Sequence, residues 1–98
     1  MTVISLLELR VKTEALDGAA ALIEETLEVT RGRPGCLGVE ITVDIDDPTH
    51  YIVVERWATL ADDAAYRVFR ATPDGASALG TVLSEPPALT RAELRTTL

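Results

Sequence analysis

The chain has 98 residues, with 47% hydrophobic and 26% charged side chains, so we expect one folded domain over residues 1–98. The net charge is −7 and the basic residues are scattered, which argues against nucleic acid and an anionic membrane surface as partners. The apolar stretches are too short to span a bilayer, and the first residues lack the features of a signal peptide, so we expect a cytoplasmic protein. The single cysteine excludes an internal disulfide and a cysteine-rich zinc site.

Residues 3–11 are rich in apolar side chains and predict the first strand. Leu7 and Leu9 share one face of this strand, whereas Ile4 and Leu6 lie on the other face. Because both faces are apolar, we expect both of them to be covered.

Residues 13–31 predict a helix that ends at the glycines and proline of residues 32–35. Its apolar side chains recur at intervals of three and four residues, which gives the helix one face to pack on a sheet. The residues of this face are Leu16, Ala20, Ile23 and Leu27.

Residues 36–46 and 50–57 predict a second and a third strand, joined by a turn at residues 46–49. In the third strand Tyr51, Val53, Glu55 and Trp57 share one face, so this strand is largely apolar there. In the second strand every other side chain is apolar, namely Leu37, Val39, Ile41, Val43 and Ile45.

Residues 59–72 predict a second helix, which Thr59 caps. Residues 76–84 predict a short helix, and residues 88–96 predict the last strand. This order of elements is that of the ferredoxin-like split β-α-β fold, an α+β class with an antiparallel sheet. Its helices can cover only one face of the sheet. The same face of a second copy is the simplest cover for the other face, so we expect a homodimer.

Three short motifs lie between residues 33 and 57. They are Pro34-Gly35-Cys36-Leu37 before the second strand, Asp47-Pro48 in the turn, and Glu55-Arg56-Trp57 at the end of the third strand. In this order the motifs resemble the antibiotic biosynthesis monooxygenase family. The resemblance implies a dimeric α+β barrel with a pocket between the sheet and its helices. It also implies varied activities, including cofactor-free oxidation of phenolic polyketides to quinones, quinol oxidation and oxidative haem breakdown.

Two positions depart from the haem-degrading relatives. Many relatives carry a histidine nine residues after the tryptophan, where this chain has Tyr66. Those that degrade haem also use an asparagine on the first strand, where this chain has Leu7. The resemblance therefore argues against haem degradation here.

The same resemblance places the face of Leu7 beside the pocket and makes it a candidate wall. Trp57 and Tyr51 are then expected as aromatic walls for a planar substrate, together with Phe69 on the second helix. The alternative for these aromatic side chains is that they only fill the core.

Glu55 shares the apolar face of Trp57, and a carboxylate there could act as a general base. The alternative is a structural glutamate bonded to the backbone or to an arginine such as Arg31 or Arg33. Tyr66 could hydrogen-bond a substrate phenol or carbonyl, and the alternative is a partly exposed surface tyrosine.

His50 is the only histidine, and its place beside a turn favours a solvated residue over a catalytic one. Cys36 has no evident partner base, so a packing role is expected. The sequence contains no nucleotide-binding, P-loop, zinc-protease or CxxC motif, so we expect no cofactor and no metal.

The leading hypothesis is a cofactor-independent monooxygenase that oxidises a small aromatic metabolite, such as a phenol, anthrone or quinol, with O2. Glu55 and Tyr66 are its candidate catalytic residues. Two alternatives stay open on the same scaffold. One is a cyclase or isomerase acting on polyketide-like substrates, and the other is a binding or stress-associated dimer without catalysis.

Overall fold

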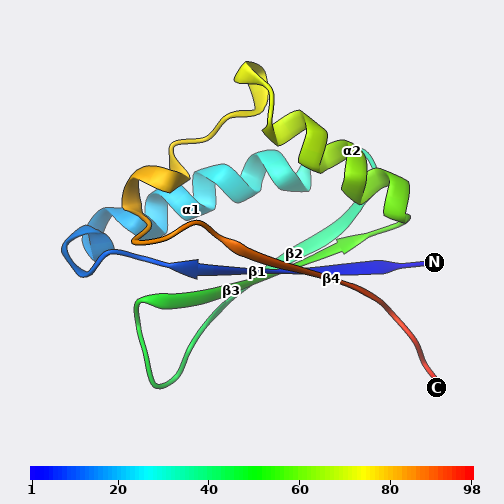
Figure 1. Cartoon of the computed structure of the whole chain (residues 1–98), viewed down its shortest axis with the longest axis horizontal. Helices are drawn as coiled ribbons and strands as arrows, with labels where there is room; N and C mark the ends of the chain where they lie inside the picture. The colour runs from blue at the N-terminus through cyan, green and yellow to red at the C-terminus, as the bar shows by residue number, and fades with distance from the viewer.

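Four strands form one antiparallel sheet in the order β2-β3-β1-β4, and both long helices lie on the same face of it (Figure 1). The computed structural model describes residues 1–98. The strands are β1 (Val3–Arg10), β2 (Cys36–Val43), β3 (His50–Trp57) and β4 (Ala88–Glu93), and the helices are α1 (Leu16–Arg31) and α2 (Leu60–Arg70). Three short 3₁₀ helices complete the chain: η1 (Thr13–Ala15), η2 (Pro73–Gly75) and η3 (Leu79–Val82). The prediction of an α+β, ferredoxin-like fold is confirmed.

Several element ends differ from those predicted. Helix α2 begins at Leu60 because the hydroxyl of Thr59 accepts a hydrogen bond from the amide of Asp62 at 3.1 Å, as its capping role requires. Residues 76–84 form only the 3₁₀ helix η3 rather than a longer helix. Strand β4 ends at Glu93 instead of residue 96, because its partner strand β1 begins at Val3, which pairs with Glu93.

Strand β2 contains a bulge that changes the phase of its alternation. Cys36 pairs with Trp57, but Gly38 pairs with the next residue of β3, Arg56, so Leu37 has no partner of its own. The alternation predicted from Leu37 onwards is therefore broken at Leu37, whose side chain is 60% exposed. Ile45 was predicted to continue this strand, but β2 ends at Val43 and Ile45 lies in the turn that follows.

The turn before β2 explains why Pro34 is followed by glycine. Gly35 has φ of +80°, which favours a residue without a side chain. A Cβ at this position would also clash with Cγ of Asp62 at the start of α2. The Gly35 carbonyl accepts a 2.8 Å hydrogen bond from the amide of Ala58, so the turn is tied to the end of β3.

The main core lies between the inner face of the sheet and α1. Leu9 and Val53 from the sheet contact Ile23 and Leu27 from the helix, and all four are buried. Ala20 was predicted for this face, but it is exposed, and Ala19 is buried in its place. A second, smaller cluster of Val3, Trp57 and Tyr66 lies under α2.

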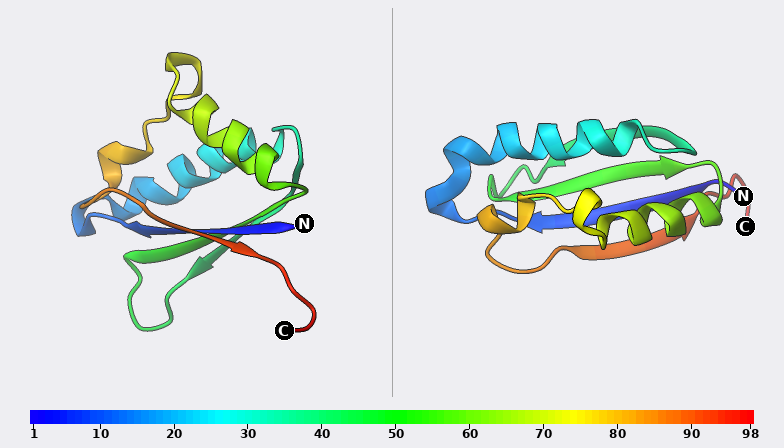
Figure 2. Two further views of the ribbon diagram at one scale, coloured as in Figure 1. Left: turned by 45° about the vertical axis from the view of Figure 1, so that its right-hand side comes forward. Right: turned by 90° about the horizontal axis from the view of Figure 1, so that it is seen from above.

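The outer face of the sheet carries no helix (Figure 2). Ile4 and Leu6 of β1 lie there beside Ile52 and Val54 of β3, as the strand pairing shows. All four are only partly buried in the single chain. Neither α1 nor α2 is long and apolar enough to cross a membrane.

Candidate functional site

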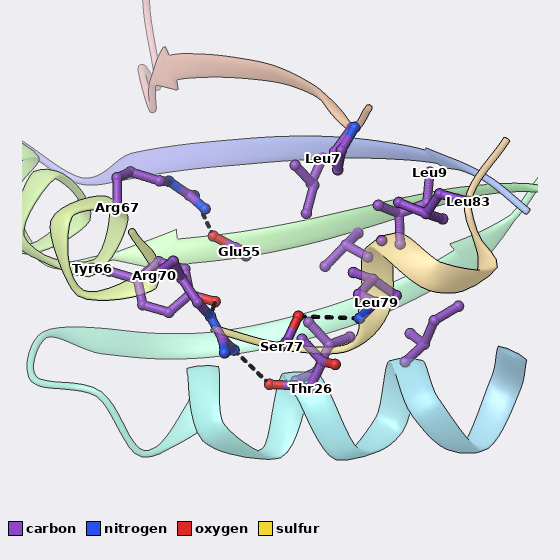
Figure 3. Close-up of a pocket in the computed structure, with 15 residues that line it drawn as sticks. Leu7, Leu9, Thr26, Glu55, Tyr66, Arg67, Arg70, Ser77, Leu79 and Leu83 are labelled. Carbon is purple, nitrogen blue, oxygen red and sulfur yellow. Dashed lines mark hydrogen bonds and ion pairs between the residues drawn. The ribbon is translucent and has the colours of Figure 1, made fainter. Parts of the chain in front are cut away.

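A cavity of about 240 Å³ lies between the inner face of the sheet, the two long helices and the segment around η3 (Figure 3). Most of its walls are aliphatic. These walls come from β1 and β3 (Leu7, Leu9 and Val53), from α1 (Ile23 and Leu27) and from the η3 segment (Leu79 and Leu83). Such a lining excludes water and favours the apolar body of a small molecule.

The end of the cavity beneath α2 is polar. Arg67 of α2 donates from Nη2 to Oε1 of Glu55 on β3 at 2.5 Å, and Trp57 donates from its indole nitrogen to the same oxygen at 3.2 Å. Oε2 of Glu55 is buried and has no hydrogen-bond partner in the protein. The site therefore holds a buried carboxylate with one oxygen held by donors and the other without a partner.

Asp63 holds Arg67 from the opposite side. Its Oδ1 accepts from Nη2 of Arg67 at 3.0 Å and from the hydroxyl of Ser5 at 2.8 Å, while Oδ2 accepts from Arg91 of β4 at 3.1 Å. Burial by itself raises the pKa of Asp63, but these hydrogen bonds and the charge of Arg67 outweigh it and bring the pKa below its usual value. Asp63 thus stays ionised and orients Arg67 towards Glu55.

Tyr66 is buried, with only 5% of its surface exposed, so the alternative of a surface tyrosine is wrong. Its ring stacks on Trp57 with a centroid separation of 4.9 Å and an interplanar angle of 30°. The hydroxyl lies 2.7 Å from the hydroxyl of Thr30 and accepts from Nε of Arg70 at 2.7 Å. Its position is therefore fixed by contacts with both helices.

Arg70 ties the two helices to the segment that follows α2. Its Nη2 donates to the carbonyl of Thr26 at 2.8 Å and to the hydroxyl of Thr30 at 3.2 Å, and its Nη1 donates to the carbonyl of Gly75 at 3.1 Å. With the bond to Tyr66, all three nitrogens of the guanidinium are engaged, and all their acceptors are uncharged. Arg70 therefore leaves a positive charge beside the cavity.

Of the predicted site residues, Leu7, Glu55 and Tyr66 line the cavity. Trp57 does not line it, because it lies fully buried between Tyr66 and the sheet. Tyr51 is half-buried against the main core instead.

Phe69 is half-buried and lies outside the cavity lining. The guanidinium of Arg33 lies 3.8 Å from the centroid of its ring, in a cation–π contact. Arg33 and Arg31 were both considered as partners of Glu55, but the arginine that holds it is Arg67.

Sequence reasoning missed Asp63, Arg67 and Arg70 because apolar residues were expected to face inward. In α2 the inward face is polar instead, and Val68 on the opposite side is 68% exposed. The spacing of Asp63, Tyr66, Arg67 and Arg70 places all four on one face of a helix. This spacing is the sequence feature that could have indicated a polar face turned towards the cavity.

His50 is buried rather than solvated, which corrects the sequence-based expectation. Its Nδ1 lies 2.9 Å from Asp44 and its Nε2 lies 2.9 Å from Glu8. Hydrogen bonding to Asp44 raises the pKa of His50, burial lowers it, and the bond to Glu8 raises it, with a net increase above the ordinary value of 6.5. This cluster lies near the β2–β3 turn and does not line the cavity.

The chain contains no group of three or more His, Cys, Asp or Glu residues placed to hold a metal ion. Cys36 is partly buried and packs against the cluster of Trp57 and Tyr66.

Comparison with solved structures gives the same fold throughout. A conserved protein from Methanosarcina mazei has a TM-score of 0.81 at 14% identity, covering 97% of this chain and 94% of that chain. A Mycobacterium tuberculosis protein has a TM-score of 0.80 at 18% identity, with coverages of 99% and 98%. A candidate antibiotic biosynthesis monooxygenase from Deinococcus radiodurans has a TM-score of 0.79 at 23% identity, with coverages of 98% and 95%.

No curated protein matches the sequence at a significant level. The sequence profile of antibiotic biosynthesis monooxygenases does match, and it spans residues 2–78, from β1 to the residue before η3. The chain therefore belongs to the antibiotic biosynthesis monooxygenase family.

Proposed function

We propose that this protein is a cofactor-independent monooxygenase that oxidises a small aromatic phenol, anthrone or quinol with O2. Family membership supports a monooxygenase-type function. The observation that carries the proposal is the buried carboxylate of Glu55, which lines an aliphatic cavity and has one oxygen without a partner. A base in such a place can take a proton from a bound hydroxyl group while the walls exclude bulk water.

The proposed reaction begins with proton transfer from the substrate hydroxyl to Oε2 of Glu55. This neutralises Glu55 and moves the negative charge to the aromatic ring, where the guanidinium groups of Arg67 and Arg70 stabilise it. Arg67 is well placed for this because its former partner, Glu55, no longer carries the charge that it balanced.

The electron-rich anion then passes one electron to O2, and the two radicals combine to form a carbon–oxygen bond. The resulting peroxide anion takes the proton back from Glu55. Loss of the ring proton at that carbon and cleavage of the O–O bond give a carbonyl group and water. For 1-naphthol the products are 1,4-naphthoquinone and one water, so the substrate supplies all the electrons and no reductant is needed.

In this proposal Tyr66 serves as the second polar group of the site. Its hydroxyl is bonded to Arg70 at 2.7 Å, so it holds that guanidinium beside the cavity. Leu7 forms part of the aliphatic wall, and Trp57 supports the ring of Tyr66 from behind.

We also propose that the protein acts as a homodimer, with the outer faces of two sheets packed together. The support is the row of half-buried aliphatic side chains on that face, which no helix covers (Figure 2). A second copy would present the same apolar side chains around a twofold axis. The cytoplasmic location stays a prediction from the sequence.

The test is O2 consumption by the purified protein with a panel of naphthols, anthrones and quinols. We expect uptake with at least one substrate at a rate above that of buffer, and formation of the corresponding quinone. Absence of uptake with every substrate, together with tight binding of one of them, would favour the cyclase or the non-catalytic binding protein instead. A Soret shift on adding haem would revive haem degradation.

A further inference from the structure

We propose that His50 makes the homodimer depend on pH: the outer sheet faces of two copies pack together while His50 is protonated, and they separate as it loses its proton. This inference rests on the homodimer proposed above and adds its regulation. It concerns the cluster of His50, Glu8 and Asp44 at one end of the outer face, which the proposed reaction does not use.

The hydrogen bonds of His50 require a protonated ring. Its Nδ1 lies 2.9 Å from Oδ2 of Asp44, and its Nε2 lies 2.9 Å from Oε1 of Glu8. An ionised carboxylate only accepts hydrogen bonds, and a neutral imidazole can donate only one. Both bonds therefore form together only in the charged form of His50. In keeping with this geometry, the hydrogen bond to Asp44 raises the pKa of His50 above its ordinary value.

A second copy of the chain fits the outer face of the sheet. On β1 and β3 the centre of that face carries no charged side chain, and we call its aliphatic residues the apolar strip: Ile4, Leu6, Ile52 and Val54. The strands are eight or six residues long, so the face measures roughly 25 by 20 Å. Such an area on each copy gives an interface at the small end of specific dimers, whose affinity a few charges can change.

The register of the sheet places the cluster directly beside the apolar strip. Glu8 pairs with Ile52, and His50 lies two residues before Ile52 on the same face of β3. The side chain of His50 is only 8% exposed, whereas those of Glu8 and Asp44 are 45% and 32% exposed. A second copy that covers Ile52 therefore comes close to Glu8 and removes water from the cluster.

Loss of the proton changes the balance of charge around His50. The charged groups around it are Glu8 and Arg10 of β1, Asp44 and Asp47 of the β2–β3 turn, and Glu85 before β4. Both long helices lie on the other face of the sheet (Figure 1). Four of these five groups are carboxylates, so neutral His50 leaves Arg10 as the only cation among them.

The sign of the pH dependence follows from this balance. In the single chain water can hydrate Glu8 and Asp44 after His50 loses its proton, but a second copy excludes that water. Carboxylates without a nearby cation are costly in a covered site, so the dimer holds the proton of His50 more tightly than the monomer does. The stabilisation of the dimer is therefore present at low pH and is lost as the pH rises through the pKa of His50, which lies above 6.5.

The test is sedimentation equilibrium of the unchanged protein at several pH values. We expect the dissociation constant of the dimer to be at least about tenfold larger at about pH 9 than at about pH 6, because each of the two clusters loses a cation. The rise should follow the proton titration of His50, which NMR can measure without overlap because it is the only histidine.

His50→Gln isolates the proton, since glutamine stays neutral and every other titratable group is retained. Its dimer should be weak at both pH values. If this variant does not fold, Glu8→Gln tests the same cluster, because it removes one carboxylate and should make the dimer tighter at about pH 9. Glu28→Gln is the matched control: Glu28 is 81% exposed on α1, so the same charge is lost away from the outer face and the full pH dependence should remain.

A dimer with the same dissociation constant at both pH values would overturn the inference and leave the homodimer standing. A dimer that becomes tighter as the pH rises would do the same. Full pH dependence in His50→Gln would assign the effect to another group and also contradict it. A monomer at every pH would refute the homodimer and this inference together, whereas the proposed reaction is tested separately by O2 uptake.

Discussion

Nη2 of Arg67 lies 2.5 Å from Oε1 of Glu55, and this ion pair joins helix α2 to strand β3 at the polar end of the cavity. The carboxylate is buried, whereas the guanidinium is 24% exposed. The pair therefore places a carboxylate at the edge of an aliphatic cavity and keeps a compensating cation beside it. Asp63 fixes the cation from its other side.

Replacing Arg67 by methionine should strongly destabilise the fold. The variant leaves Glu55 and Asp63 buried without the cation they share, which costs about 3 kcal/mol for a pair of this kind. Urea unfolding measures the change. The double variant Glu55→Gln/Arg67→Met should recover part of the loss, since one uncompensated charge is removed. An unchanged unfolding midpoint for Arg67→Met would show that the ion pair contributes little.

Replacing Tyr66 by phenylalanine should cost about 1–2 kcal/mol of stability, because one buried and one partly buried hydrogen bond are lost while the ring remains. The stacking on Trp57 should persist, so the near-ultraviolet circular dichroism of the tryptophan should change little. Thermal unfolding and the dichroism spectrum test this together. A variant as stable as the unchanged protein would contradict the closed network around Tyr66.

The His50 cluster predicts a loss of stability as the pH rises. Hydrogen bonding to Asp44 and Glu8 keeps the pKa of His50 in the folded protein above 6.5. The contribution of protonated His50 to the free energy of unfolding is therefore fully present below pH 6.5, and it is lost as the pH rises through the pKa of the folded state. Arg10, nearby on β1, acts in the opposite direction. Urea unfolding at about pH 6 and about pH 9 should show the larger stability at the lower pH.

His50→Gln is the matched variant for this prediction. It cannot take up a proton, so the difference in stability between the two pH values should shrink. A direct proton titration of His50 by NMR provides the independent check. A midpoint below 6.5 would contradict the account of this cluster.

The dimer prediction concerns Val54, which lies at the centre of the uncovered sheet face. A lysine there would place a charge in the interface, so Val54→Lys should shift the protein from dimer to monomer at the same concentration. Val68→Lys is the matched control, because Val68 is exposed on the outer side of α2. Light scattering after size exclusion measures both, and a monomeric unchanged protein would refute the interface.

The sequence predicted the fold well where one face of an element is apolar and the other is not. Strand β3 was predicted with its observed bounds, because His50 follows a clear turn and Trp57 ends an alternating run. Strand β2 was predicted to be longer than it is and to alternate without interruption. The bulge at Leu37 could not be predicted, because the apolar residues alternate regularly in the sequence on both sides of it.

The site was only partly predictable for a related reason. The sequence proposed Glu55, Tyr66 and Leu7, which line the cavity, but it did not indicate that Arg67 pairs with Glu55. Helix α2 turns its charged face inward because that face completes a network of hydrogen bonds around Glu55. The expectation that the apolar face of a helix packs on the sheet is therefore wrong for α2. The ion pair could have been predicted from two features together, namely a carboxylate on the apolar face of β3 and arginines spaced along one face of α2.

The most direct measurement of the central claim is the fate of heavy-isotope O2 supplied with 1-naphthol to the unchanged protein and to Glu55→Gln. The unchanged protein should consume O2 and yield a quinone that carries one labelled oxygen atom, with the second label in water. Glu55→Gln should lose at least about a hundredfold of this rate, the loss expected when a general base is removed. Equal labelled turnover by the two proteins, or a quinone without label, would contradict the assignment of Glu55 as the base of a monooxygenase.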